Sequence, residues 1–152
     1  MSAPANAASR FGTAWLLLCG ALALHVADEA LTDFLSVYNP AVEGIRRSFP
    51  FFPMPTFTFQ AWLAGLIAAV GLLSVLAFPA FQGRRWMVLL AYPFGILMLL
   101  NGSGHVAGSI YLGRMMPGVY TAPLLVGTSI YLLVRAWQAR KLSRRPPEGM
   151  QG

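Results

Sequence analysis

Four long apolar stretches run along the chain, separated by short polar or proline-rich breaks. They cover about residues 11–38, 58–81, 86–112 and 119–137, and even the shortest is long enough to cross a bilayer as an α-helix. None of the breaks is long enough to hold a folded domain of its own. The pattern therefore predicts one all-α domain over residues 11–137, built as a four-helix transmembrane bundle.

The breaks between these stretches predict the connections. Residues 39–57 contain four prolines, which interrupt helices, so we expect a structured, proline-rich outer loop between the first two spans. Within this loop, residues 42–49 are expected to form one short interfacial helix. Residues 1–10 are small and polar and are predicted to be disordered. Residues 138–152 are basic and contain prolines, which is typical of a solvated cytoplasmic tail.

Composition favours lipid over water as the surroundings of these helices. Hydrophobic residues make up 57% of the chain and charged residues 11%, whereas soluble domains average about 25% charged residues. A soluble chain of 152 residues is too small to bury so much apolar surface. The net charge of +6 does not indicate nucleic acid, because the arginines stand at the ends of apolar segments and form no basic face. We therefore expect the lipid bilayer as a partner and no nucleic acid.

The distribution of basic residues predicts the orientation of the chain in the membrane. Four spans place both termini on one side together with the turn at residues 83–85. That side holds eight basic residues: Arg10, Arg84, Arg85, Arg135, Arg140, Lys141, Arg144 and Arg145. The opposite side holds three: Arg46, Arg47 and Arg114. The positive-inside rule then predicts a multi-pass protein of the plasma (inner) membrane with both termini in the cytoplasm.

Ionisable residues gather in the first span. Three of the five acids of the chain, Asp28, Glu29 and Asp33, fall within six residues, and His25 stands one turn earlier. At about 100° per residue, Asp28 lies about −60° and Glu29 about +40° from His25, so these three share one polar face. Ionisable groups inside a bilayer cost free energy unless they are paired or hydrated. Their clustering therefore predicts a binding or catalytic site.

A second polar row lies on the third span. Asn101 and His105 are i and i+4, one above the other on the same helix face. At about 1.5 Å per residue, His25 stands about 21 Å above Phe11, and His105 stands about 28 Å above Trp86. Both polar rows therefore fall in the outer half of the bilayer.

We expect the two rows to form one pocket between the first and third spans, open toward the outer face. Its candidate catalytic residues are His25, Asp28, Glu29, Asn101 and His105. Three further residues are expected to close it and to contact a substrate: Tyr111, Tyr120 and Thr121.

The same residues carry a resemblance to a known family. The first span contains His25-Val26-Ala27-Asp28-Glu29, which resembles the signature of the HXXEE-domain family, small bacterial membrane proteins named for that motif. Asn101 and His105, followed by Pro117-Gly118-Val119-Tyr120-Thr121-Ala122, are similar to the second block of that family, an Asn/His helix and then a P-G-x-x-T-A turn. The resemblance spans about residues 15 to 135. In one departure, Asp28 stands where the family has Glu, so its carboxylate is one methylene shorter. The resemblance implies an enzymatic role with no assigned reaction.

The first functional hypothesis is a membrane-embedded enzyme that acts on a lipid-like or small apolar substrate. In one version His25, Glu29 and His105 bind a divalent metal such as zinc or iron, because imidazole and carboxylate are ligands that these metals accept. In a metal-free version a histidine is the base and Glu29 the acid. No nucleotide-binding, dinucleotide-binding, serine-hydrolase or H-E-x-x-H motif occurs in the sequence.

Two other classes of function stay open at the level of sequence. The same side chains serve small transporters and proton relays, although four spans without an inverted repeat make a small transporter unless the protein dimerises. Alternatively, the polar cluster serves only helix packing in a structural membrane protein. The sequence leaves the oligomeric state open, with a homo-oligomer among the alternatives.

Overall fold

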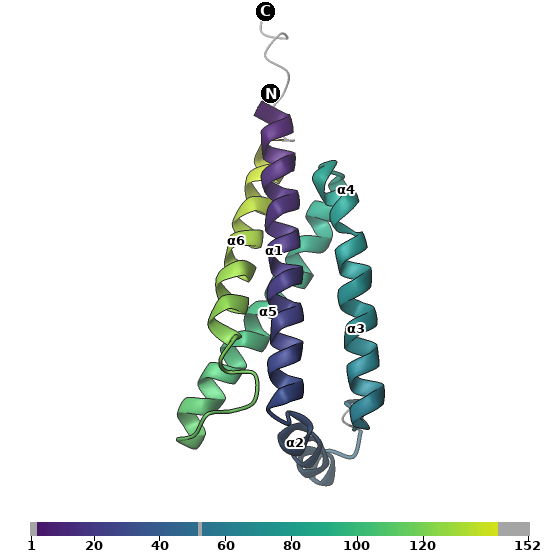
Figure 1. The fold of residues 1–152 in the computed structure, drawn as a ribbon, viewed down its shortest axis with the longest axis vertical. Coiled ribbons are helices and arrows are strands. Elements are labelled where there is room, and N and C mark those ends of the chain that lie inside the picture. The colour runs from purple at the N-terminus through teal and green to yellow at the C-terminus, as the bar shows by residue number, and fades with distance from the viewer. Residues whose placement is uncertain (1–2, 52, 143–152) are drawn as a thin grey trace, which may run out of the picture.

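The computed structural model describes residues 3–51 and 53–142 and is helical through most of this part of the chain (Figure 1). Six helices follow one another: α1 (Ala3–Leu31), α2 (Leu35–Ser48), α3 (Phe59–Val75), α4 (Ala77–Phe81), α5 (Arg85–Leu112) and α6 (Ala122–Leu142). No strand occurs among the described residues, so the predicted all-α class is confirmed.

Three helical segments are long and apolar enough to cross a membrane: Asn6–Leu31, Phe59–Phe81 and Arg85–Leu112. They correspond to the first three expected spans. The fourth, 119–137, appears as α6, which does not reach the apolar character of the others. This helix begins at Ala122, and Arg135, Gln138 and its basic last turn lower its mean hydropathy. The described residues therefore contain three candidate spans where we expected four.

Helix α1 differs from its prediction at both ends. Residues 3–10, expected to be disordered, form its first turns. At the other end the helix stops at Leu31 instead of continuing to residue 38, because Asp33 takes the left-handed conformation with φ of 57°. The Phe34 N–H then donates to the Glu29 carbonyl over 3.0 Å, which closes the helix in a Schellman motif. Aspartate adopts this conformation more readily than most residues other than glycine.

The expected outer loop between the first two spans is largely helical. Helix α2 includes Pro40 and covers 14 residues, where we expected a short helix only over 42–49. After α2, the described residues 49–51 and 53–58 form no helix or strand, and Asn39 attaches this segment to α2. The Asn39 amide donates to the Phe57 carbonyl over 2.9 Å and accepts from the Phe57 N–H over 3.1 Å. The loop that the prolines predict is thus confined to the segment after Ser48.

The first five residues of the predicted basic tail, 138–142, are helical. Helix α6 continues through Gln138 to Leu142. Residues 143–152 lie outside the described residues.

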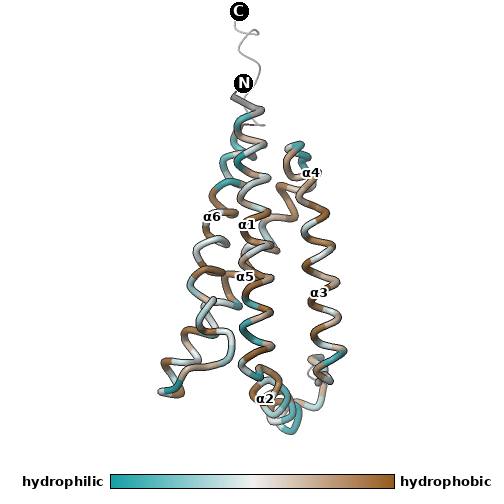
Figure 2. The backbone as a smooth tube through the Cα atoms, in the orientation of Figure 1, coloured by the Kyte–Doolittle hydropathy of each residue, from teal (hydrophilic) through white to brown (hydrophobic). Residues whose placement is uncertain are grey.

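The core lies around α6, which packs against both α1 and α5. Its fully buried side chains include Trp15, Leu18, Leu125 and Leu132. The Trp15 indole N–H donates to the Leu73 carbonyl over 2.8 Å and so attaches α3 to α1. Figure 1 shows the first turns of α1, the end of α6 and α4 at one end of the molecule, with α2 and the α5–α6 connection at the other. Most residues of α3 are hydrophobic (Figure 2).

Candidate metal centre

Three ionisable side chains meet near the end of the molecule that carries α2. His25 and Glu29 are one turn apart on α1, and His105 comes from α5. Glu29 Oε1 lies 3.6 Å from His25 Nε2 and 3.1 Å from His105 Nε2. The two imidazole rings meet edge to face with their centroids 4.7 Å apart. These residues are only 1%, 5% and 6% exposed for His25, Glu29 and His105, so the cluster is shielded from its surroundings.

The protonation of His105 follows from the partner of its other nitrogen. Its Nδ1 lies 2.5 Å from the Pro117 carbonyl oxygen, which can only accept a hydrogen bond. Nδ1 therefore carries a proton and donates it to Pro117. In the neutral ring the lone pair is then on Nε2, the nitrogen that faces Glu29.

The orientation of His25 follows from a short hydrogen-bond chain. Asp28 Oδ2 accepts from both the N–H and the hydroxyl of Thr121, each over 3.0 Å. The Thr121 hydroxyl has a single proton, which it donates in the hydrogen bond to the Asp28 carboxylate, so its oxygen accepts from His25 Nδ1 over 2.9 Å. His25 therefore also presents an Nε2 lone pair to Glu29.

The two tautomers leave the cluster with an electrostatic problem. The unprotonated Nε2 atoms of His25 and His105 both face the Glu29 carboxylate, and each of these three groups can only accept a hydrogen bond. A proton between His105 and Glu29 fits their 3.1 Å separation, but the 3.6 Å to His25 exceeds a hydrogen bond. Among the described residues, His25 Nε2 makes no hydrogen bond of good geometry, although the Asn101 side chain lies near this ring. A buried polar atom left in this state costs about 1–3 kcal/mol. A single cation bound between the three atoms would satisfy all of them together.

The geometry of the cluster matches a metal site with three ligands. One atom from each of His25, Glu29 and His105 lies within 4.8 Å of the others. Two imidazoles and one carboxylate are a donor set that zinc and iron(II) accept. Histidines that ligate metals usually donate their second N–H to a carbonyl or a carboxylate-linked group, as both rings do here.

The segment between α5 and α6 supplies parts that the sequence did not reveal. We interpreted Pro117 and Gly118 only as a turn, yet the Pro117 carbonyl orients His105. Gly118 has φ of +82°, and a Cβ there would lie 2.9 Å from His105 Cε1 and 3.0 Å from Glu29 Cγ. Glycine takes this conformation without strain, and its lack of a Cβ permits the close approach. The sequence did contain a signal for these residues, namely the P-G-x-x-T-A block. The spacing of this block from His105 does not show which of its backbone atoms point toward the cluster.

An aromatic pair forms another wall that sequence reasoning missed. The Phe34 ring lies 5.7 Å from His105 and stacks on Trp62 of α3, with ring centroids 5.9 Å apart. Phe34 comes to this place because α1 ends at Asp33 and the chain turns back. This reversal could not be foreseen from an apolar pattern that continues through residue 38.

Of the other predicted site residues, Asn101 and Thr121 lie beside the cluster, and the two tyrosines do not. Asn101 is exposed one turn before His105, with its side chain near the His25 ring. Tyr111 and Tyr120 are 89% and 67% exposed and do not wall the cluster as expected. Thr121 does reach it. The cluster is covered by the segment around Gly118 instead of lying in an open pocket.

Comparison with known proteins adds one match. The family described as "protein of unknown function with HXXEE motif" matches residues 15–132 of the chain. No curated protein and no solved structure matches it. The matched segment contains every residue of the cluster and of its hydrogen-bonding partners.

Proposed function

Since the chain belongs to the family of proteins of unknown function with the HXXEE motif, we propose that it is a membrane-embedded metalloenzyme. His25, Glu29 and His105 bind one divalent transition metal, zinc or iron(II). The observation that carries this proposal is the arrangement of the histidines. Both Nδ1 atoms are engaged by fixed partners, and both Nε2 atoms converge on one carboxylate oxygen in a buried site.

The proposed centre supports a catalytic role because three protein ligands leave coordination positions for a water molecule or a substrate. When bound, such a metal acts as a Lewis acid or lowers the pKa of a bound water. The protein residues hold the ligands in place: Pro117 orients His105, and Asp28 orients His25 through Thr121. The nearby aromatic wall of Phe34 and Trp62 favours a lipid-like or small apolar substrate.

The membrane placement is also part of the proposal. Only 11% of the most apolar stretch within Phe59–Phe81 is buried within the protein. An exposed apolar surface of this kind is expected to face lipid. We assign α6 as a fourth span, because it packs against α1 and α5, both candidate spans. With four spans, the excess of basic residues at one end supports our proposal that both termini lie on the cytoplasmic side of the plasma membrane.

Metal analysis of the detergent-purified wild-type protein tests the proposal. We expect about one zinc or iron per chain by plasma mass spectrometry, because one cluster of three ligands is present. Removal of the metal with a chelator is expected to lower the melting temperature, and zinc or iron(II) to restore it, because a ligand that binds only the folded state stabilises it. Protein that stays metal-free after incubation with both ions contradicts the proposal.

A proton relay is the second candidate function, and the 3.1 Å separation of His105 and Glu29 favours it. That separation suits a shared proton even without a metal. The relay predicts proton uptake into vesicles that depends on a pH gradient and persists in metal-free protein. A metalloenzyme predicts neither property, and a cluster that serves packing alone predicts neither metal nor proton movement.

Replacement of Asp28 tests whether the first acid of the motif acts through His25. Asp28→Ala removes the acceptor of two hydrogen bonds and frees the Thr121 hydroxyl to turn its proton toward His25. We expect the affinity for zinc to fall about 10–100-fold, the usual effect of losing a partner of a metal ligand. The measurement is competition with a chelator of known affinity. Asp28→Asn keeps an oxygen acceptor and is expected to lose less, and equal losses in the two variants would speak against this role.

A further inference from the structure

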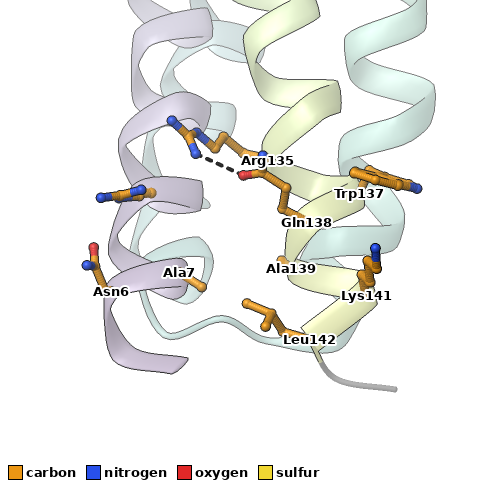
Figure 3. Close-up of a pocket in the computed structure, with 9 residues that line it drawn as sticks. Asn6, Ala7, Arg135, Trp137, Gln138, Ala139, Lys141 and Leu142 are labelled. Carbon is orange, nitrogen blue, oxygen red and sulfur yellow. Dashed lines mark hydrogen bonds between the residues drawn. The ribbon is translucent and has the colours of Figure 1, made fainter. Parts of the chain in front are cut away.

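A basic cavity lies far from the metal centre, between the first turns of α1 and the last turns of α6 (Figure 3). It has a volume of about 410 Å³. Its polar lining comes from Asn6, Arg10, Arg135, Gln138 and Lys141. The lining contains three cationic side chains and no acid, so an anion is the complementary ligand.

Arg135 is the best-fixed cation of this cavity. One of its terminal nitrogens donates to Gln138 Oε1 over 2.8 Å, a bond drawn in Figure 3, and its guanidinium stacks over the Tyr131 ring at 4.9 Å. Its Nε is buried and has no hydrogen-bond partner in the part of the chain that the structure describes. A guanidinium held in place in this way is suited to a phosphate, because it carries several N–H donors and a phosphate offers several acceptor oxygens.

A second, apolar groove continues along the same seam between α1 and α6. It has a volume of about 530 Å³ and is lined by Thr13, Leu17, Gly20 and Leu24 of α1 and by Leu124 and Thr128 of α6, among others. Together with Arg10 of the basic cavity, the α1 residues follow one another at spacings of three and four. Such residues share one helix face. The basic cavity and the apolar groove, which also reaches Phe81 of α4, therefore follow one face of α1, with a cationic end and an apolar end.

From this continuity we infer that the α1–α6 seam binds an anionic phospholipid. The phosphate lies in the basic cavity, and an acyl chain lies in the groove. The level of the cavity agrees, since Arg10 directly precedes the apolar run of α1, and Trp137, an aromatic typical of membrane interfaces, also lines it. Basic pockets between membrane helices are known to take anionic headgroups. The inference rests on the membrane placement proposed above and is independent of the metal centre.

Native mass spectrometry of the full chain in detergent tests this site. The probes are dioleoyl phosphatidylglycerol, phosphatidylcholine with the same chains, and inorganic phosphate. We expect phosphatidylglycerol to be retained best. Arg10→Gln, at an exposed position, is expected to weaken its binding about fivefold, since each basic residue near an anionic membrane surface contributes about 1 kcal/mol. Arg85→Gln removes an equal charge at the same end of the molecule but outside the cavity, and should leave binding unchanged.

The groove has its own pair of variants. Nothing lies within 4 Å of a Cβ at Gly20 or at Gly65, so a side chain can begin at both positions without a clash at its Cβ. Gly20→Leu fills the groove and is expected to weaken phosphatidylglycerol binding, whereas Gly65→Leu on α3 adds the same side chain elsewhere and should have no effect.

Three results would overturn the inference. Equal retention of phosphatidylcholine would show that charge is not recognised, and unchanged binding in Arg10→Gln and Gly20→Leu would show that the seam is not the site. Displacement of the lipid by inorganic phosphate, with Gly20→Leu without effect, would assign the cavity to a free phosphate instead. Metal content measured on the same samples keeps a failure here separate from a failure of the metal centre.

Discussion

Replacing His105 with alanine is expected to reduce the metal content of the purified protein from about one per chain to background. The substitution removes one of three ligands and leaves His25 and Glu29, which come from the same helix and cannot surround an ion. We expect the affinity for zinc to fall more than about 100-fold, beyond the 10–100-fold that follows from losing a supporting hydrogen bond. Glu29→Gln should behave similarly, because it keeps the shape of the side chain but removes the only carboxylate of the set.

The matched control for these ligand variants is Asp33→Asn. Asp33 is an exposed acid four residues after Glu29, and asparagine also tolerates its left-handed conformation. This variant should keep its metal and its melting temperature. Metal content is measured by plasma mass spectrometry after identical purification, with circular dichroism to verify that each variant is helical. Full metal content in both His105→Ala and Glu29→Gln would reject the cluster as a metal centre.

The second large effect is expected for Gly118→Ala. A methyl group there would lie 2.9 Å from His105 Cε1 and 3.0 Å from Glu29 Cγ, so the ligands or the α5–α6 segment must move. The left-handed backbone adds about 1–2 kcal/mol of strain for alanine. Because the metal requires fixed ligands, we expect zinc affinity to fall about 10–100-fold together with the melting temperature.

Gly113→Ala separates strain from contact. Gly113 also has a positive φ, +62°, but nothing lies within 4 Å of a Cβ at that position. Its alanine variant should lose stability through the backbone alone and keep its affinity for zinc. The two variants are compared by thermal unfolding and by competition with a chelator. If both lose the same stability and both keep the metal, Gly118 serves the turn only and the close approach to His105 is without consequence.

The two acids of the motif, Asp28 and Glu29, have different contacts, so we expect their variants to differ. His25 and Glu29 are one helical turn apart, so both side chains reach the same point beside His105. Asp28, at the adjacent position, points its carboxylate to Thr121 and holds His25 indirectly. The departure from the family pattern falls at this supporting position. The shorter aspartate reaches both donors of Thr121 over 3.0 Å, so the loss of one methylene does not prevent this role.

The sequence by itself determined the helical class, the places of the long helices and the residues able to carry chemistry. Hydropathy and helix periodicity depend on residues that are close in the sequence, so they predict helices without knowledge of the tertiary structure. The common level of the polar rows on the first and third spans was also predictable, because the rise per residue of a helix is constant. The helix ends were predicted less well. One local conformation at Asp33 ends α1 seven residues early, and the apolar pattern continues past it.

Only the tertiary structure decided which of these residues meet. The Pro117 carbonyl, the Gly118 backbone and the Thr121 hydroxyl reach the cluster through the path of the α5–α6 segment. That path depends on how α6 packs against α1 and α5, which no pattern of neighbours encodes. The same packing turns Tyr111 and Tyr120 outward although the sequence places them beside the site. Hydrogen-bond partners that fix a histidine tautomer are contacts across the chain, and they exist only once the helices have assembled.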